Sequence, residues 1–169
     1  MANAERTKSF AKGNIGEKVT KEFFLSKNYV VTPATLDQQV NGHWDFRAVN
    51  EKKDLLIEVK TDFAAAKTKN VFLETEVGDS VGFMGKIQPD SPIIFCFCFP
   101  QAQELAFIRS SNLLDIDLAK LHFRKFTHPS NTYSAGGYLL PKSDFISYCY
   151  RIYCWEVDEH GKKTFYKEK

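Results

Sequence analysis

Three charged residues stand out in stretches that are otherwise apolar or strand-like: Asp45, Glu58 and Lys60. Glu58 and Lys60 are two positions apart in Leu-Leu-Ile-Glu-Val-Lys, so in a strand their side chains leave the same face about 7 Å apart. Placing two charges in a core strand is costly unless each has a partner. Residues 50–54 have the composition of a turn. A hairpin centred on this turn places Asp45 opposite Glu58, with Cβ atoms about 5 Å apart.

Two carboxylates that face each other repel unless a cation lies between them. Mg²⁺ suits this position because it prefers oxygen ligands and is commonly held by one or two carboxylates. Such an ion is a Lewis acid for a phosphoryl group and a source of hydroxide, and Lys60 nearby could position the water and stabilise negative charge. The three residues therefore form a set suited to phosphodiester hydrolysis. The alternative is an ordinary salt-bridged sheet face, in which Glu58 pairs with Lys60 or Arg47.

The elements around these residues predict an α/β domain. Residues 8–27 have helical spacing, with a stripe of small residues (Gly13, Gly16 and Thr20) that would allow a close approach to a neighbour. The apolar run 92–99 is typical of a central strand that is buried on both faces. Residues 143–153 suit either a helix or a strand. The other predicted elements are strands at 43–49, 55–62, 71–77, 104–109 and 137–140, and a helix from Ser110 or Ser111 through Phe123.

These motifs, in this order, resemble the PD-(D/E)xK nuclease superfamily, which has the restriction-endonuclease-like fold. The resemblance rests on Gly13-Asn-Ile-Gly16-Glu17 in the first helix, Asp45 in His43-Trp-Asp-Phe, and Ile57-Glu58-Val59-Lys60. Trp44 stands where many members have proline. The short Gly-x-x-x-Glu opening is similar to that of archaeal Holliday-junction resolvases and small phage-type nucleases.

The resemblance covers residues 10 to about 110 and implies a fold and a site. The implied fold is α/β, with a restriction-endonuclease-like core in which a mixed, mostly antiparallel β-sheet is flanked by helices. The resemblance implies that Asp45, Glu58 and the Val59 carbonyl ligate Mg²⁺ and that Lys60 positions the attacking water. Glu17 would bind a second metal ion or orient a water there, although it could equally pair with Lys21 four residues later.

Two accessory residues and a set of lysines complete the predicted site. Glu74 shares a strand face with Glu76 if residues 71–77 alternate regularly, and it could shape the site or contact a metal; an exposed strand acid is the alternative. His43 lies two residues before Asp45 and could reach a substrate phosphate, against the alternative of a surface histidine. Candidate contacts to the DNA backbone, which could equally be solvated lysines, are Lys12, Lys18, Lys21, Lys67 and Lys69.

Length and composition limit the class of protein. The chain has 169 residues, a formal net charge of +2 and 14% aromatic residues, which indicates one folded domain rather than a disordered chain. No apolar run approaches the roughly 20 residues that span a bilayer, so we expect a cytoplasmic protein that does not enter a membrane. The four cysteines stand in apolar or aromatic stretches and indicate buried thiols rather than a metal cluster.

The residues and the resemblance together predict a metal-dependent DNA endonuclease that uses Mg²⁺, with Mn²⁺ as a possible substitute. We expect it to recognise DNA structure, such as a branch, a flap or an end, more than sequence. A homodimer is expected because cutting both strands usually takes two active sites. The alternatives are a sequence-specific restriction or homing endonuclease, a nuclease fold that binds DNA without cutting, and a two-carboxylate glycosidase, in which Lys60 would have no evident role.

Overall fold

The larger of two β-sheets carries the candidate site. The structure is a computed structural model that describes the backbone of residues 2–127 and 134–168, and the side chains from residue 14 onward within these ranges. Seven strands form this sheet in the order β1-β2-β3-β6-β7-β10-β11. Neighbours are antiparallel, except that β3 and β6 are parallel. The strands are β1 (Val30–Pro33), β2 (Phe46–Val49), β3 (Asp54–Thr61), β6 (Ile93–Phe99), β7 (Glu104–Arg109), β10 (Arg151–Val157) and β11 (Lys163–Lys167).

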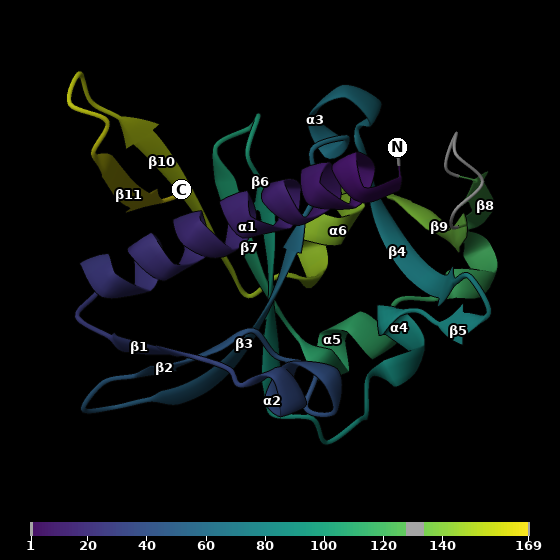
Figure 1. The fold of residues 1–169 in the computed structure, drawn as a ribbon, viewed down its shortest axis with the longest axis horizontal. Coiled ribbons are helices and arrows are strands. Elements are labelled where there is room, and N and C mark those ends of the chain that lie inside the picture. Colours follow the sequence, from purple (N-terminus) through teal and green to yellow (C-terminus); the bar gives the residue numbers. More distant parts are fainter. Residues whose placement is uncertain (1, 128–133, 169) are drawn as a thin grey trace.

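Four antiparallel strands form a second sheet in the order β5-β4-β9-β8. This sheet lies to one side of the large sheet, on the right in Figure 1. Its strands are β4 (Asn70–Val77), β5 (Ser80–Val81), β8 (His122–Thr127) and β9 (Ser134–Pro141). The predicted strand at 71–77 is therefore present, but it belongs to a different sheet from the strands that carry Asp45 and Glu58.

One long helix and several short ones accompany the sheets. Helix α1 lies across one face of the large sheet, and the short helices lie elsewhere around the two sheets (Figure 1). None of the described helices combines enough length with enough apolar character to span a lipid bilayer. The helices are α1 (Ala2–Ser26), α2 (Leu36–Val40), α3 (Ala65–Thr68), α4 (Phe83–Lys86), α5 (Ser110–Leu114), the 3₁₀ helix η1 (Leu118–Lys120) and α6 (Lys142–Tyr148).

Helix α1 approaches β3 closely because small residues face the sheet. A Cβ atom added at Gly16 would lie 2.0 Å from Oγ1 of Thr61, so only glycine fits without a shift. Thr20 is fully buried one turn later. The predicted stripe of small residues therefore lies at the helix–sheet contact, with Gly13 outside the residues described to the side chain. This contact sets the position of Glu17 above the sheet.

Strand β6 separates two hydrophobic cores, as its apolar run predicts. Cys96 and Cys98 face the core under α1, and Phe95, Phe97 and Phe99 face the core on the other side. The second core includes residues from β4, β9, α4, α5 and α6, so the second sheet and the short helices cover this face. All four cysteines are free thiols; Cys96 and Cys98 are buried as predicted, whereas Cys149 and Cys154 are half-buried.

The mixed α/β class and the mostly antiparallel sheet are confirmed, whereas one predicted helix is wrong. The helix predicted from Ser110 or Ser111 through Phe123 ends at Leu114, and β8 begins at His122. Between them Asp117 accepts a hydrogen bond from the Ala119 backbone N–H and caps the short helix η1. Residues 122–127 pair with β9 instead of continuing a helix, because the partner strand supplies their backbone hydrogen bonds.

The last 60 residues contribute to both sheets and both cores. Residues 143–153 contain both predicted structures in turn, since α6 ends at Tyr148 and β10 begins at Arg151. Strand β11, which the sequence pattern did not indicate, pairs with β10 at the edge of the large sheet. Trp155 and Phe165 from these strands are buried in the core under α1.

Candidate active site

The hairpin that carries the site has the predicted register. Strands β2 and β3 are antiparallel, with Phe46 opposite Ile57 and Val49 opposite Asp54. The turn between them is held by Asn50, whose side chain accepts hydrogen bonds from the backbone N–H groups of Lys52 and Lys53. A turn of fixed length specifies the pairing of every following residue. Continued by one position, this register places Asp45 opposite Glu58.

Asp45 lies just outside the regular ladder, because β2 begins at Phe46. Its backbone N–H donates to the Ile57 carbonyl (2.7 Å), and its carbonyl accepts from the Ala34 N–H (2.9 Å). The Asp45 carboxylate oxygen Oδ2 accepts a hydrogen bond from the Val59 backbone N–H at 2.7 Å. The Asp45 side chain is thus fixed against the middle of β3, beside Glu58.

The electrostatic environment makes the charged form of Asp45 unfavourable. Burial, followed by the nearby charge of Glu58, raises the pKa of Asp45 from 3.8 to about 7. The Val59 N–H opposes this effect, Glu17 adds to it, and Lys60 opposes it weakly. Near neutral pH a large share of Asp45 is therefore protonated, and a cation placed between the two carboxylates would favour the ionised form.

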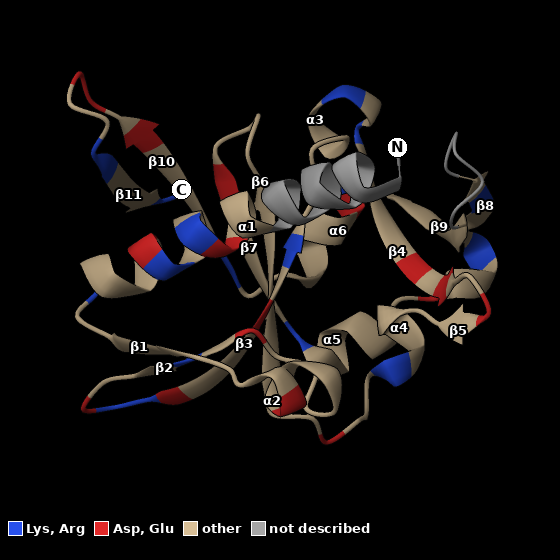
Figure 2. Ribbon diagram, in the orientation of Figure 1, with Lys and Arg blue, Asp and Glu red and all other residues tan. Residues whose placement is uncertain are grey.

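Glu58 and Lys60 form an ion pair on β3. The Lys60 ammonium donates to Oε1 of Glu58 at 2.6 Å, and the two side chains are 29% and 15% exposed, respectively. The same ammonium lies 5.0 Å from the centre of the Phe83 ring. Figure 2 shows an acidic segment and, farther along the same strand, a basic segment on β3. This ion pair is also the structure expected of an ordinary salt-bridged face, so the pair alone does not decide between the two interpretations.

Glu17 forms the alternative contact that the sequence left open. Its carboxylate pairs with Lys21 one helical turn later, at 2.9 Å. Its negative charge nevertheless acts on Asp45, whose pKa it helps to raise. Glu17 is therefore close enough to Asp45 for their charges to repel each other, but its ion-pair partner is Lys21.

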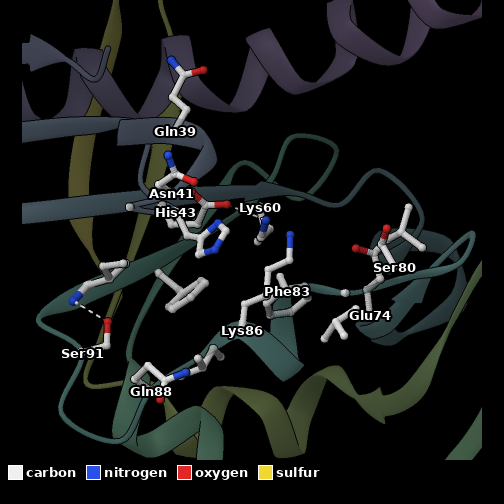
Figure 3. A pocket seen from close by; sticks show the side chains of 18 residues that line it. Gln39, Asn41, His43, Lys60, Glu74, Ser80, Phe83, Lys86, Gln88 and Ser91 are labelled. Carbon is white, nitrogen blue, oxygen red and sulfur yellow. Dashed lines mark hydrogen bonds and ion pairs between the residues drawn. The ribbon is translucent and has the colours of Figure 1, made fainter. Parts of the chain in front are cut away.

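A pocket of about 490 Å³ opens beside the ion pair. Glu58 and Lys60 line one wall, and His43 and Glu74 also line the pocket. Figure 3 shows His43, Lys60 and Glu74 around the same space. His43 has a positive φ of 55° and precedes the start of β2, so the strand predicted at 43–49 does not include His43.

A β-bulge places Glu74 and Glu76 on opposite faces of β4. Glu74 pairs with Gly137, and Glu76 pairs with the adjacent residue Gly136, so Thr75 is the extra residue of the bulge. The prediction that Glu74 and Glu76 share a strand face is therefore wrong, because a bulge reverses the alternation. Glu74 lines the pocket, whereas Glu76 is exposed and its carboxylate lies 3.9 Å from the Lys125 ammonium.

Among the described residues, none of the lysines proposed to contact DNA lines the pocket. Lys18 on α1 is exposed, and Lys21 is engaged by Glu17. Lys67 on α3 and Lys69 just after it are exposed, at the end of the segment that follows β3. The side chain of Lys12 lies outside the described residues.

Two pocket residues were not predicted from the sequence. Phe83 and Lys86 belong to the short helix α4, in a segment that the glycines at positions 78, 82 and 85 indicate to be a loop. Their spacing of three residues, which puts an aromatic and a basic side chain on one side of a helical turn, is the signal that could have identified them. The charge of Lys86 reaches Glu74, where it opposes the rise in pKa caused mainly by burial.

Asp45 and Glu58 supply the type of oxygen donor that a hard divalent cation prefers. Mg²⁺ is commonly bound by one or two carboxylates and keeps several waters, and the mutual repulsion seen at Asp45 is what a cation would relieve. Within the described part of the chain, no group of three or more His, Cys, Asp or Glu side chains is arranged to hold a metal ion.

Comparison with known proteins adds no relative: no family model, curated protein or solved structure matches this chain. Its function is therefore inferred from the residues and their geometry.

Proposed function

We propose that this chain is a metal-dependent nuclease that hydrolyses phosphodiester bonds in DNA, on a restriction-endonuclease-like core. The observation that carries the proposal is the placement of Asp45 against the middle of β3, bonded to the Val59 N–H at 2.7 Å and repelled by Glu58. A structural salt bridge needs one carboxylate and one cation. Asp45 is a second carboxylate held beside Glu58, although its charged form is unfavourable there. The need to hold a cation explains this arrangement.

In this proposal Asp45 and Glu58 hold Mg²⁺ or Mn²⁺, and the Val59 carbonyl is a third protein oxygen. The ion would supply Lewis-acid stabilisation of the phosphoryl group and activate water. The Asp45 carboxylate has its orientation fixed by the Val59 N–H, so it does not have to be ordered when a cation binds.

Lys60 is the residue assigned to the reacting phosphate. Its ammonium is held between Glu58 and the Phe83 ring, at the wall of a pocket. A positive charge in this partly buried place stabilises the negative charge that develops on a phosphoryl group more strongly than a fully hydrated lysine would. Lys60 would also orient the attacking water.

The proposal extends to substrate and assembly. DNA is the expected polymer, recognised through its backbone and its shape more than through its sequence. Each active site cuts one strand, so a homodimer is proposed for cleavage of both strands.

A panel of labelled DNAs tests the proposal. The purified protein is incubated with linear duplex, single strand, flap and four-way junction, with Mg²⁺, with Mn²⁺ and with EDTA. Cleavage that needs the metal ion and differs between DNA shapes supports a structure-directed nuclease. Cleavage confined to one short sequence on both linear and branched DNA would indicate a restriction or homing enzyme, and binding without cleavage would indicate a DNA-binding module.

A further inference from the structure

The pocket beside Lys60 has features that phosphodiester cleavage does not require. Its wall opposite β3 is formed by α4 and the neighbouring β4–β5 hairpin, which contribute an aromatic ring, a lysine and a carboxylate: Phe83, Lys86 and Glu74. Figure 3 shows these side chains around the same space as Lys60. The volume of about 490 Å³ is in the usual range for a small-molecule site, which is roughly 300–1,000 Å³.

The Phe83 ring is held rigidly at the pocket wall. Its centre lies 5.9 Å from the Phe95 ring and 6.1 Å from the Phe97 ring, so it is anchored to the buried core. Helix α4 begins after Gly82, where an added Cβ would be 2.7 Å from the Glu74 carbonyl oxygen, so glycine allows α4 to lie against β4. Phe83 remains half-buried and lines the pocket. An anchored aromatic ring of this kind is a platform on which a base can stack.

Polar groups surround the ring on two sides. The Lys60 ammonium lies 5.0 Å from the ring centre, and the exposed Lys86 belongs to the same helix as Phe83. Lys60, Lys86 and the Phe83 backbone N–H each act to lower the pKa of Glu74 against the rise caused by burial, so the carboxylate lies near the aromatic residue. Lysine ammonium groups bind phosphate, and a carboxylate accepts hydrogen bonds from the amino groups on base edges.

We propose that this pocket binds one unpaired nucleotide of the DNA substrate, with its base against Phe83 and within reach of Glu74, and its phosphate toward Lys60 and Lys86. The inference rests on the proposed nuclease function and specifies its substrate class. A base inside a duplex must first be unstacked to enter such a pocket, at a cost of a few kcal/mol. The favoured substrates are therefore DNAs in which a nucleotide next to the cut is already unpaired, such as an overhang, a flap or a single strand.

Binding of fluorescein-labelled oligonucleotides in EDTA tests this without any cleavage. Fluorescence anisotropy is measured with a single strand and with a blunt duplex of the same sequence. We compare the wild type with Phe83→Leu, which keeps an apolar anchor but removes the stacking ring, and with Lys86→Gln. Lys167→Gln, an exposed lysine on β11 at the far side of the molecule, is the matched control (Figure 1).

The wild type is expected to bind the single strand more tightly than the duplex. Phe83→Leu should weaken single-strand binding by about five- to 160-fold, the range that corresponds to loss of one base–aromatic stack, and affect the duplex less. Lys86→Gln should weaken it by a smaller factor, and Lys167→Gln should leave it unchanged. A thermal melt establishes that each variant is folded; Lys86→Gln changes an exposed residue and decides the case if Phe83→Leu does not fold.

Equal affinities of the wild type for single strand and duplex, or unchanged single-strand binding in folded Phe83→Leu and Lys86→Gln, would overturn the inference. These outcomes are separate from a failure of the proposed function. A protein that cuts duplex DNA with Mg²⁺ but shows no effect of the pocket variants is a nuclease without this pocket function. A protein that shows the pocket effects but cuts no DNA has the nucleotide pocket and lacks the catalysis.

Discussion

Replacing Asp45 by asparagine should stabilise the metal-free protein at neutral and alkaline pH. Asparagine has nearly the same shape, and its side-chain oxygen can still accept the hydrogen bond from the Val59 N–H, but it carries no charge to be repelled by Glu58. Active-site residues often lower stability in this way, because they are selected for function.

The size of the effect follows from the raised pKa of Asp45. The difference between the usual pKa of 3.8 and the value of about 7 in the folded protein corresponds to about 4 kcal/mol when the carboxylate is fully ionised, at about 1.36 kcal/mol for each pKa step. Asp45 is partly exposed, so water screens some of this cost. We therefore expect Asp45→Asn to raise the free energy of unfolding by about 2 kcal/mol at pH 8.

The pH dependence gives the sign of the effect. Because the folded protein holds its proton at Asp45 up to a higher pH than the unfolded chain does, the wild type loses stability relative to Asp45→Asn as pH rises from about 4 to about 7. The advantage of the variant at pH 5 should be less than about half of its value at pH 8. Urea unfolding in EDTA at several pH values, followed by circular dichroism, measures both quantities.

Asp54→Asn is the matched control. The hydrogen bond from Arg47 lowers the pKa of this exposed carboxylate, so the charged form of Asp54 favours folding and that contribution is lost as pH falls. The two variants should therefore respond to pH in opposite directions. An Asp45→Asn protein that is no more stable than the wild type at pH 8, or an advantage that does not grow with pH, would refute the view that Asp45 is a repelled, desolvated carboxylate.

The remaining predictions concern the metal ion, the helix contact and the DNA lysines. Mg²⁺ should raise the melting temperature of the wild type but not of Asp45→Asn, because a ligand that binds only the folded state stabilises it, by about 2.7 kcal/mol at a hundred times its Kd; an equal shift in both proteins would place the ion elsewhere. Gly16→Ala should lower the free energy of unfolding by about 1–3 kcal/mol through overpacking, since the new Cβ would lie 2.0 Å from Oγ1 of Thr61; wild-type stability in a urea titration would mean that α1 and β3 are farther apart. Lys67→Gln should reduce the slope of log affinity against log salt for duplex DNA by about 0.9 if this lysine contacts one phosphate, and an unchanged slope would remove it from the interface.

Local sequence signals predicted the hairpin and the central strand well. The turn at Asn50 and the alternation on both sides are short-range features, so they determine the register that brings Asp45 to Glu58. The apolar run of β6 is also a short-range feature. It identifies a strand buried on both faces, because its alternate side chains enter two different cores. Gly16 likewise marks a close helix–sheet contact.

Long-range pairing was not predictable from the sequence alone. Strand β4 pairs with β9, whose residues come 58 to 71 positions later than their partners, and no local pattern indicates that these two strands leave the large sheet. The bulge at Thr75 belongs to this pairing, and it places Glu76 on the opposite strand face from Glu74, which lines the pocket. Leu113, Leu118 and Leu121 have near-helical spacing because short helical turns place them against the core, which explains the incorrect long helix.

The central claim is that Asp45, Glu58 and Lys60 act together on a phosphodiester bond. Single-turnover cleavage of a labelled flap DNA with Mg²⁺, measured for the wild type, Asp45→Asn, Glu58→Gln and Lys60→Ala, tests it most directly, with anisotropy binding of the same DNA measured in parallel. We predict that each variant loses at least about 100-fold in the cleavage rate while binding stays within a fewfold of the wild type, because phosphate contacts elsewhere supply the affinity. Cleavage by Lys60→Ala at the rate of the wild type, or cleavage that continues in EDTA, would contradict the account.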